Sequence, residues 1–179
     1  TLGPIKINGD LNLTTNCAIY YINGPVWVVG NITIDNNVKV VLSQGFGTLS
    51  TVVIADDPAQ QNNVGTIVVQ NGVRICGSAG YNSGTNQCNA SNGSYIMFLS
   101  TYNGTNNAIA LKNNSDGAIF YASAGTLDVE QTASAKQITG YKVELENNAA
   151  ITYESGLQSV NFSSGPSAGW KISSWKEVQ

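Results

Sequence analysis

Carboxylates are the residues of this chain whose type and spacing come closest to supporting chemistry. The 179 residues include 11 Asp and Glu, 8 Lys and Arg, and no His. Without histidine, Ser-His-Asp and Cys-His catalytic arrangements and histidine metal sites are excluded. The pattern Asp128-Val-Glu130 returns sixteen residues later as Glu144-Leu-Glu146. Strands stacked at that step would place these four carboxylates beside one another on an outward face.

This acidic group has two interpretations. Like charges on neighbouring strands repel each other, and a bound Ca²⁺ would relieve the repulsion. Alternatively, the group is a solvated acidic surface for which Lys112, Lys136 and Lys142 supply counter-charges. Ca²⁺ requires about six to eight oxygen ligands, which a flat face seldom provides. We therefore favour the solvated surface and expect no other cofactor.

A second acidic feature is the adjacent pair Asp56-Asp57, which resembles the neighbouring aspartates of β-helical polysaccharide hydrolases. Those enzymes also use His-Gly and Arg-x-Lys motifs, whereas this chain has no His and Arg74 is followed by Ile-Cys. The pair precedes Pro58, and Asp is common in turns. Two carboxylates at glycosidase separation are not identifiable. We predict that the protein is not an enzyme, with polysaccharide binding or degradation as the alternative.

Three cysteines leave one without a partner. Cys76 and Cys88 flank a short segment of Gly, Ser, Asn and Tyr that a disulfide would close easily. A disulfide is typical of an oxidising, extracytoplasmic setting. Cys17 falls at a position predicted to point inward, so we expect a small buried residue there.

Charge and hydropathy limit the partners and the location. The net charge is −3, and the few basic residues are spread thinly. This argues against nucleic acid and against contact with an anionic membrane. No run of apolar residues approaches the length of a membrane span. We expect an extracellular or cell-surface protein whose export signal or anchor precedes Thr1.

The elements that must position these residues come from a repeated pattern. Two apolar residues alternate, and a turn centred on asparagine follows them. The six copies begin at Leu11, Ile32, Ile67, Ile109, Leu127 and Val143. The shortest steps between copies leave room for three short strands but not for a βαβ unit. Stacked copies would bury their apolar sides together, which predicts one all-β domain over 1–179. The expected fold is a right-handed parallel β-helix (β-solenoid) of about six or seven turns.

Asparagine is suited to the corners of such a fold. It tolerates left-handed backbone angles, and its amide can bond the backbone of a tight turn. Amides of neighbouring turns could also bond one another in a ladder. The Asn-Asn and Asn-Gly pairs are therefore predicted to be corners.

Longer insertions are the expected places for binding. Segments 43–50 and 77–93 should leave one corner, and segments 56–65 and 100–107 another. Residues 166–179, which include Trp170 and Trp175, are predicted to cap the last turn. The candidate binding residues on the insertions are Tyr81, Asn82, Asn86, Tyr102 and Asn103.

Several segments resemble one protein family. Gly24-Pro-Val-Trp-Val-Val-Gly-Asn-Ile-Thr-Ile34, Gly117-Ala-Ile-Phe-Tyr-Ala122 and Trp170-Lys-Ile-Ser-Ser-Trp-Lys-Glu177 are similar to the C-terminal β-solenoid domain of pilin-like secreted proteins of candidate-phylum bacteria. The resemblance covers nearly the whole chain except the segment between Cys76 and Cys88. It implies a cell-surface or pilus-associated module with no catalytic residues to carry over.

Together these features predict a non-enzymatic structural or adhesive module of a pilus or envelope. Its expected partners are other pilus or envelope subunits or a surface glycan. A solenoid that assembles end to end is a further alternative. It is disfavoured by the predicted cap.

Overall fold

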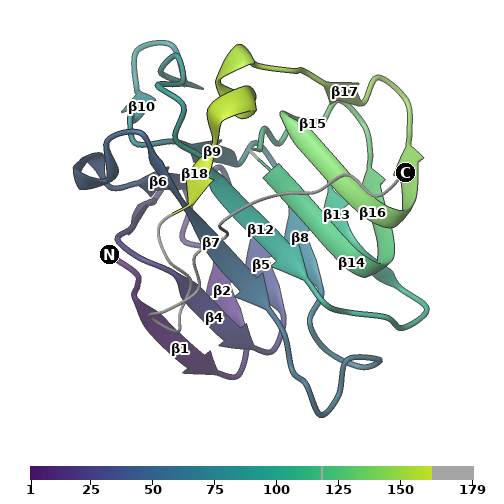
Figure 1. Cartoon of the computed structure of the whole chain (residues 1–179). Coiled ribbons are helices and arrows are strands. Elements are labelled where there is room, and N and C mark those ends of the chain that lie inside the picture. Colours follow the sequence, from purple (N-terminus) through teal and green to yellow (C-terminus); the bar gives the residue numbers. More distant parts are fainter. Residues whose placement is uncertain (118, 163–179) are drawn as a thin grey trace, which may run out of the picture.

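Parallel β-strands make up nearly all of the regular structure in the computed structural model, which describes residues 1–117 and 119–162 (Figure 1). The predicted cap at 166–179 lies outside these residues. Two short 3-10 helices, η1 (Gln44–Phe46) and η2 (Ser155–Ser159), are the helical elements of the described chain, and neither is long enough to cross a membrane. The chain is therefore all-β, as predicted.

Most strands belong to three rows, in which each strand pairs in parallel with its neighbours from other cycles of the chain. The first row is β1 (Ile5–Asn8), β4 (Val26–Val29), β7 (Leu49–Ala55) and β12 (Ile96–Ser100). The second row is β2 (Leu11–Leu13), β5 (Ile32–Ile34), β8 (Ile67–Val69) and β13 (Asn107–Leu111). The third row is β3 (Ile19–Ile22), β6 (Lys39–Leu42) and β9 (Arg74–Cys76).

Two long strands join the first row to the second. The first half of β14 (Ile119–Val129) pairs with β12 and its second half with β13, and β16 (Gln137–Leu145) pairs along both halves of β14. The result is one nearly closed sheet of parallel strands (Figure 1). The short strands β15 (Ser134–Ala135) and β17 (Ala150–Ile151) pair beyond the third row, and β18 (Asn161–Phe162) pairs with the start of β7.

The first apolar residue of every copy lies in one column. Strand register pairs Leu11 with Ile32, Ile32 with Ile67, Ile67 with Ile109, and so on through Leu127 to Val143. The middle of this column is fully buried, while Val143 at its end is 42% exposed. The predicted register of the six copies is confirmed, and it exists because each copy completes the core of its neighbours.

The corners carry the left-handed backbone that was predicted for asparagine. Asn36, Asn37, Asn71, Asn113, Asn114 and Asn148 all have positive φ. The amide of Asn113 donates to Oδ1 of Asn71 at 3.0 Å, and the amide of Asn71 donates to Oδ1 of Asp35 at 2.7 Å. A ladder of polar side chains therefore joins three successive corners.

The corner of the first copy corrects the expectation that Cys17 is buried. Its turn is one residue longer than the others, so that the left-handed position falls on Cys17, with φ 58°. Cys17 is an exposed free thiol, and the inward partner of Val40 is Tyr20 instead of Ile19. Because side chains alternate along a strand, one extra residue exchanges the two faces of β3. Ile19 and Tyr21 consequently point outward.

The insertions leave the strands where the sequence predicts. Asn92 of the segment 77–93 donates to the carbonyl of Gly47 at 2.9 Å, so this segment meets the segment 43–50. The backbone amide of Asn103 donates to the carbonyl of Gln61 at 2.9 Å, so the segments 100–107 and 56–65 also meet. Each pair of insertions therefore shares a corner.

Candidate functional site

The segment 77–93 is the most elaborate surface feature of the described chain. It contains the antiparallel strands β10 (Tyr81–Asn82) and β11 (Gln87–Cys88), and a disulfide joins Cys76 to Cys88 with the two Cα atoms 5.2 Å apart. The disulfide predicted from sequence is thus present. It fastens the returning arm of this hairpin loop to the end of β9.

Side chains of the hairpin loop hold its own turns. The Tyr81 hydroxyl donates to Oδ1 of Asn86 at 2.7 Å, and Oδ1 of Asn82 accepts from the backbone amide of Gly84 at 2.9 Å. The amide of Asn89 donates to the carbonyl of Ala79 at 2.7 Å. Asn82 and Asn86, predicted as binding residues, therefore first serve to shape the loop.

The hairpin loop covers two cations of the third row. Lys39 and Arg74 pair in register and are each 6% exposed. The Lys39 ammonium lies 5.5 Å from the centre of the Tyr81 ring and donates to the carbonyl of Asn37. The Arg74 guanidinium donates to the carbonyls of Val73 and Asn114 and to that of Asn86 in the hairpin loop. These carbonyls and the ring offset part of the cost of removing both charges from water.

A groove of about 400 Å³ lies beside the hairpin loop. Its floor comes from the outward face of the third row, where the loop covers Lys39 and Val41 but leaves Ile19 and Tyr21 each 45% exposed. The groove is lined by Ile19, Tyr21, Val41, Ser43, Gln44, Ala79, Gly80, Tyr81 and Asn89. Two tyrosines and several neutral polar side chains therefore line one open surface.

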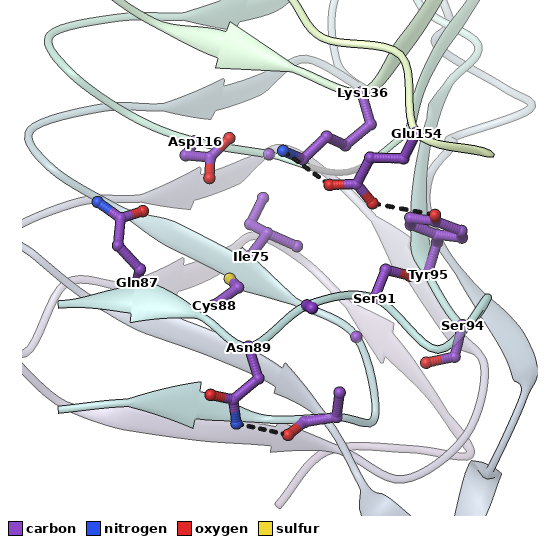
Figure 2. Close-up of a pocket in the computed structure, with 14 residues that line it drawn as sticks. Ile75, Gln87, Cys88, Asn89, Ser91, Ser94, Tyr95, Asp116, Lys136 and Glu154 are labelled. Carbon is purple, nitrogen blue, oxygen red and sulfur yellow. Dashed lines mark hydrogen bonds and ion pairs between the residues drawn. The ribbon is translucent and has the colours of Figure 1, made fainter. Parts of the chain in front are cut away.

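A smaller hollow of about 140 Å³ lies on the other side of the loop (Figure 2). Figure 2 shows the Lys136 side chain directed at Glu154, and Glu154 directed at Tyr95. The Lys136 ammonium is 3.0 Å from Oε1 of Glu154, and the Tyr95 hydroxyl donates to Oε2 at 3.1 Å. Asp116 lines the same hollow and accepts a hydrogen bond from the Ser134 hydroxyl at 2.7 Å.

The charges of this hollow stabilise one another. Burial opposes the charge on Lys136, but Glu154 and Asp116 outweigh it and raise the pKa of the lysine. Burial and the neighbouring Glu154 also raise the pKa of Tyr95. Both oxygens of Glu154 are occupied by these partners, so the carboxylate is not a free general base. The arrangement is typical of a structural network.

The remaining predicted loop residues lie apart from this site. Tyr102 is 2% exposed, which corrects the expectation of an exposed aromatic residue. The segment 100–107 turns its ring into the core, where burial of a large aromatic surface is favourable. Asn103 is exposed. Asp56 and Asp57 accept hydrogen bonds within the segment 56–65, so this pair stabilises a loop.

The acidic group on β14 and β16 has the predicted register, because Asp128 pairs with Glu144. Lys112 forms an ion pair with Glu130 at 2.6 Å, and Lys142 forms one with Glu144. Asp128 departs from expectation because it is only 4% exposed. Within residues 1–117 and 119–162, no group of three or more Cys, Asp or Glu could hold a metal ion. Asp128, Glu130, Glu144 and Glu146, the ligands of the less favoured Ca²⁺ interpretation, therefore do not form such a group.

Of the residues that line the groove, Tyr21, Ser43, Gln44 and Asn89 were not named as binding candidates from the sequence. With the regular spacing of the copies Tyr21 would point inward, but the longer first turn places it on the outward face of β3. The signal was present in the corner itself: aligning Asn16 with Asn36, the first asparagine of the next corner, adds the extra residue. Gln44 belongs to the segment 43–50, which was expected to carry binding, and within that segment it lies in η1.

No protein-family model, no curated protein and no solved structure matches the chain significantly.

Proposed function

We propose that the chain is a right-handed parallel β-helix of about six or seven turns that acts as a rigid, non-enzymatic module outside the cell or on its surface. Its function is structural or adhesive, within a pilus or another envelope structure. The observation that carries this proposal is the disulfide-closed hairpin loop on the third row of strands, with an open groove at its side.

A rigid support favours attachment. The strands beneath the loop belong to a parallel stack with a continuous hydrophobic core, and the loop itself is closed by Cys76–Cys88. A binding surface that is already ordered loses little conformational entropy when a partner arrives. Binding residues on loops held by such a scaffold are a common arrangement in proteins. The disulfide also agrees with an oxidising environment.

The side chains that line the groove indicate which classes of partner it could bind. The groove is lined by neutral side chains, which suits a surface glycan or the uncharged part of another envelope subunit. Nucleic acid is a poor partner, because binding it requires clustered positive charge and the chain carries −3.

Polysaccharide degradation is the competing function, and the hollow in Figure 2 is where it would have to occur. Asp116 and Glu154 both line this hollow. A glycosidase needs one carboxyl group that donates a proton and a second that attacks or activates water. Both oxygens of Glu154 are engaged by Lys136 and Tyr95, so the hollow does not offer the two available carboxyl groups that this chemistry needs.

Two measurements on the same polysaccharides separate these functions. The chain is incubated with insoluble cellulose, chitin, mannan and peptidoglycan, and both co-sedimentation and release of reducing ends are measured. We expect co-sedimentation with at least one polymer and no release above that of a buffer control. Release that disappears in Glu154→Gln would show an enzyme and refute the proposal.

A further inference from the structure

We infer that the groove between the hairpin loop and β3 binds an uncharged hexopyranose glycan against the rings of Tyr21 and Tyr81. This inference rests on the proposed attachment function and specifies its ligand. The face of a sugar ring carries C–H groups that pack on aromatic rings, while its hydroxyls require hydrogen-bonding groups at the edge.

The groove exists because the hairpin loop covers only part of the third row. On β6 and β9 the loop buries Lys39, Val41 and Arg74, with Val41 only 3% exposed. On the edge strand β3, Ile19 and Tyr21 remain 45% exposed. The loop edge that carries Tyr81 therefore stands as a wall beside an apolar floor. Tyr21 lines the same groove from the floor.

The wall is ordered before any ligand binds. The hydroxyl of Tyr81 donates to Asn86, and the Lys39 ammonium lies 5.5 Å from the ring centre. The Cys76–Cys88 disulfide fixes the arm of the loop that follows. Ordering Tyr81 thus adds little to the entropic cost of binding.

Polar groups at the groove edge match sugar hydroxyls. Ser43, Gln44 and Asn89 line the groove, and their side chains contain both donors and acceptors. Among the described residues, the Tyr21 hydroxyl makes no intramolecular hydrogen bond, so it is available to a ligand. Mixed donors and acceptors are what a polyhydroxylated ligand requires.

Charge determines which glycans fit. None of the residues that line the groove is Asp, Glu, Lys or Arg. The nearby ammonium of Lys39 is only 6% exposed and already engaged by the Tyr81 ring and the Asn37 carbonyl. A uronic acid would therefore lose hydration without gaining an ion pair. A neutral hexopyranose has no such penalty.

The test uses cellotetraose, mannotetraose and laminaritetraose as neutral probes and tetragalacturonate as the charged probe. Binding to the full chain is measured by isothermal titration calorimetry and saturation-transfer-difference NMR. We expect at least one neutral tetrasaccharide to bind roughly tenfold more tightly than tetragalacturonate. Tyr21→Ala and Tyr81→Ala should each weaken that binding by about tenfold, as truncation of a central aromatic contact does.

Matched variants show whether the groove is responsible. Tyr21→Phe keeps the ring and should retain most of the affinity. Tyr141→Ala removes a tyrosine that is 84% exposed on β16, far from the groove in the strand order, and should leave affinity unchanged. Thermal unfolding followed by circular dichroism identifies any variant that has lost its fold. Tyr21→Ala is the decisive variant, because its side chain is on the surface.

The outcomes separate this inference from the proposed function. If a neutral tetrasaccharide binds with an affinity that Tyr21→Ala and Tyr81→Ala do not change, the groove is not the binding site, while the proposed attachment to glycans stands. If none of the neutral probes binds when it is present at about 10 mM, a concentration that would reveal even a millimolar Kd, the inference that the ligand is a glycan is wrong. Release of reducing ends would instead overturn the non-enzymatic function.

Discussion

Asp128 offers the sharpest test of the energetics, because it is a carboxylate buried without adequate partners. Its side chain is 4% exposed, and Oδ2 accepts a hydrogen bond from the Asn107 amide at 2.8 Å. Oδ1 is buried with no hydrogen-bond donor among the described residues. Burial, followed by the neighbouring Glu130, raises the pKa of Asp128 to about 6. Replacing Asp128 by Asn should therefore stabilise the protein at neutral pH.

The size and sign of the effect follow from this pKa. A rise from 3.8 to about 6 corresponds to about 3 kcal/mol of ionisation cost in the folded state. The folded state binds the proton more tightly than the unfolded state, so stability falls as the pH rises from about 4 to about 6. Between about pH 4.5 and about pH 7.5, the two pKa values predict a loss of about 2 kcal/mol. The Asn variant has no proton to lose and should not show this loss.

The charges around Asp128 define the control. Glu130 lies on the same chain segment and pairs with Lys112, and β16 presents Glu144 beside Asp128 and is followed by Glu146. The amide of Asp128→Asn can still accept from Asn107 and can donate towards Glu130. Glu144→Gln removes a charge from the same group, but its side chain is 40% exposed. A surface charge of this kind contributes well below 1 kcal/mol.

Chemical denaturation at the two pH values measures the effect. The difference in unfolding free energy between Asp128→Asn and the original chain should grow by about 2 kcal/mol from about pH 4.5 to about pH 7.5. The same difference for Glu144→Gln should change by less than about 0.5 kcal/mol. An equal gain for Asp128→Asn at both pH values, or no gain at neutral pH, would contradict the argument.

Three further predictions concern the corners and the core. Cys17 is exposed while the other two cysteines form a disulfide, so Ellman's reagent should titrate one thiol in the folded protein, and a native count of zero would place Cys17 inside. Asn71→Ala removes two side-chain hydrogen bonds at a position with φ 56°, and it should lower the unfolding free energy by about 1–3 kcal/mol. Asn71→Gly should lower the unfolding free energy by less, because glycine tolerates that backbone angle. Ile109→Ala should cost about 2–5 kcal/mol in urea denaturation, and equal loss in Val143→Ala, at the exposed end of the same column, would argue against the stacked core.

The candidate site could be predicted from the sequence only in part. The disulfide and the hairpin loop follow from two cysteines around a segment rich in turn-forming residues. Tyr81 and Asn86 follow as its aromatic and amide residues. Tyr102 belongs to a segment of similar composition but is buried. Its burial depends on the packing of strands that are distant in the sequence, and the local sequence does not reveal that packing. Tyr21 lines the groove only because one added residue at the first corner exchanges the inward and outward faces of β3.

By itself the sequence determined what is local and periodic. The alternation of apolar residues determined where the strands lie, and asparagine determined the left-handed corners. The common pattern of the copies determined their register, as in the column of Ile32, Ile67 and Ile109. These features depend on single residues and on the fixed twofold period of a strand. The tertiary structure decided which outward side chains are covered. Burial of Lys39, Arg74 and Asp128, and exposure of Tyr21, depend on where loops and side chains from other cycles come to rest. No periodicity along the chain encodes that placement.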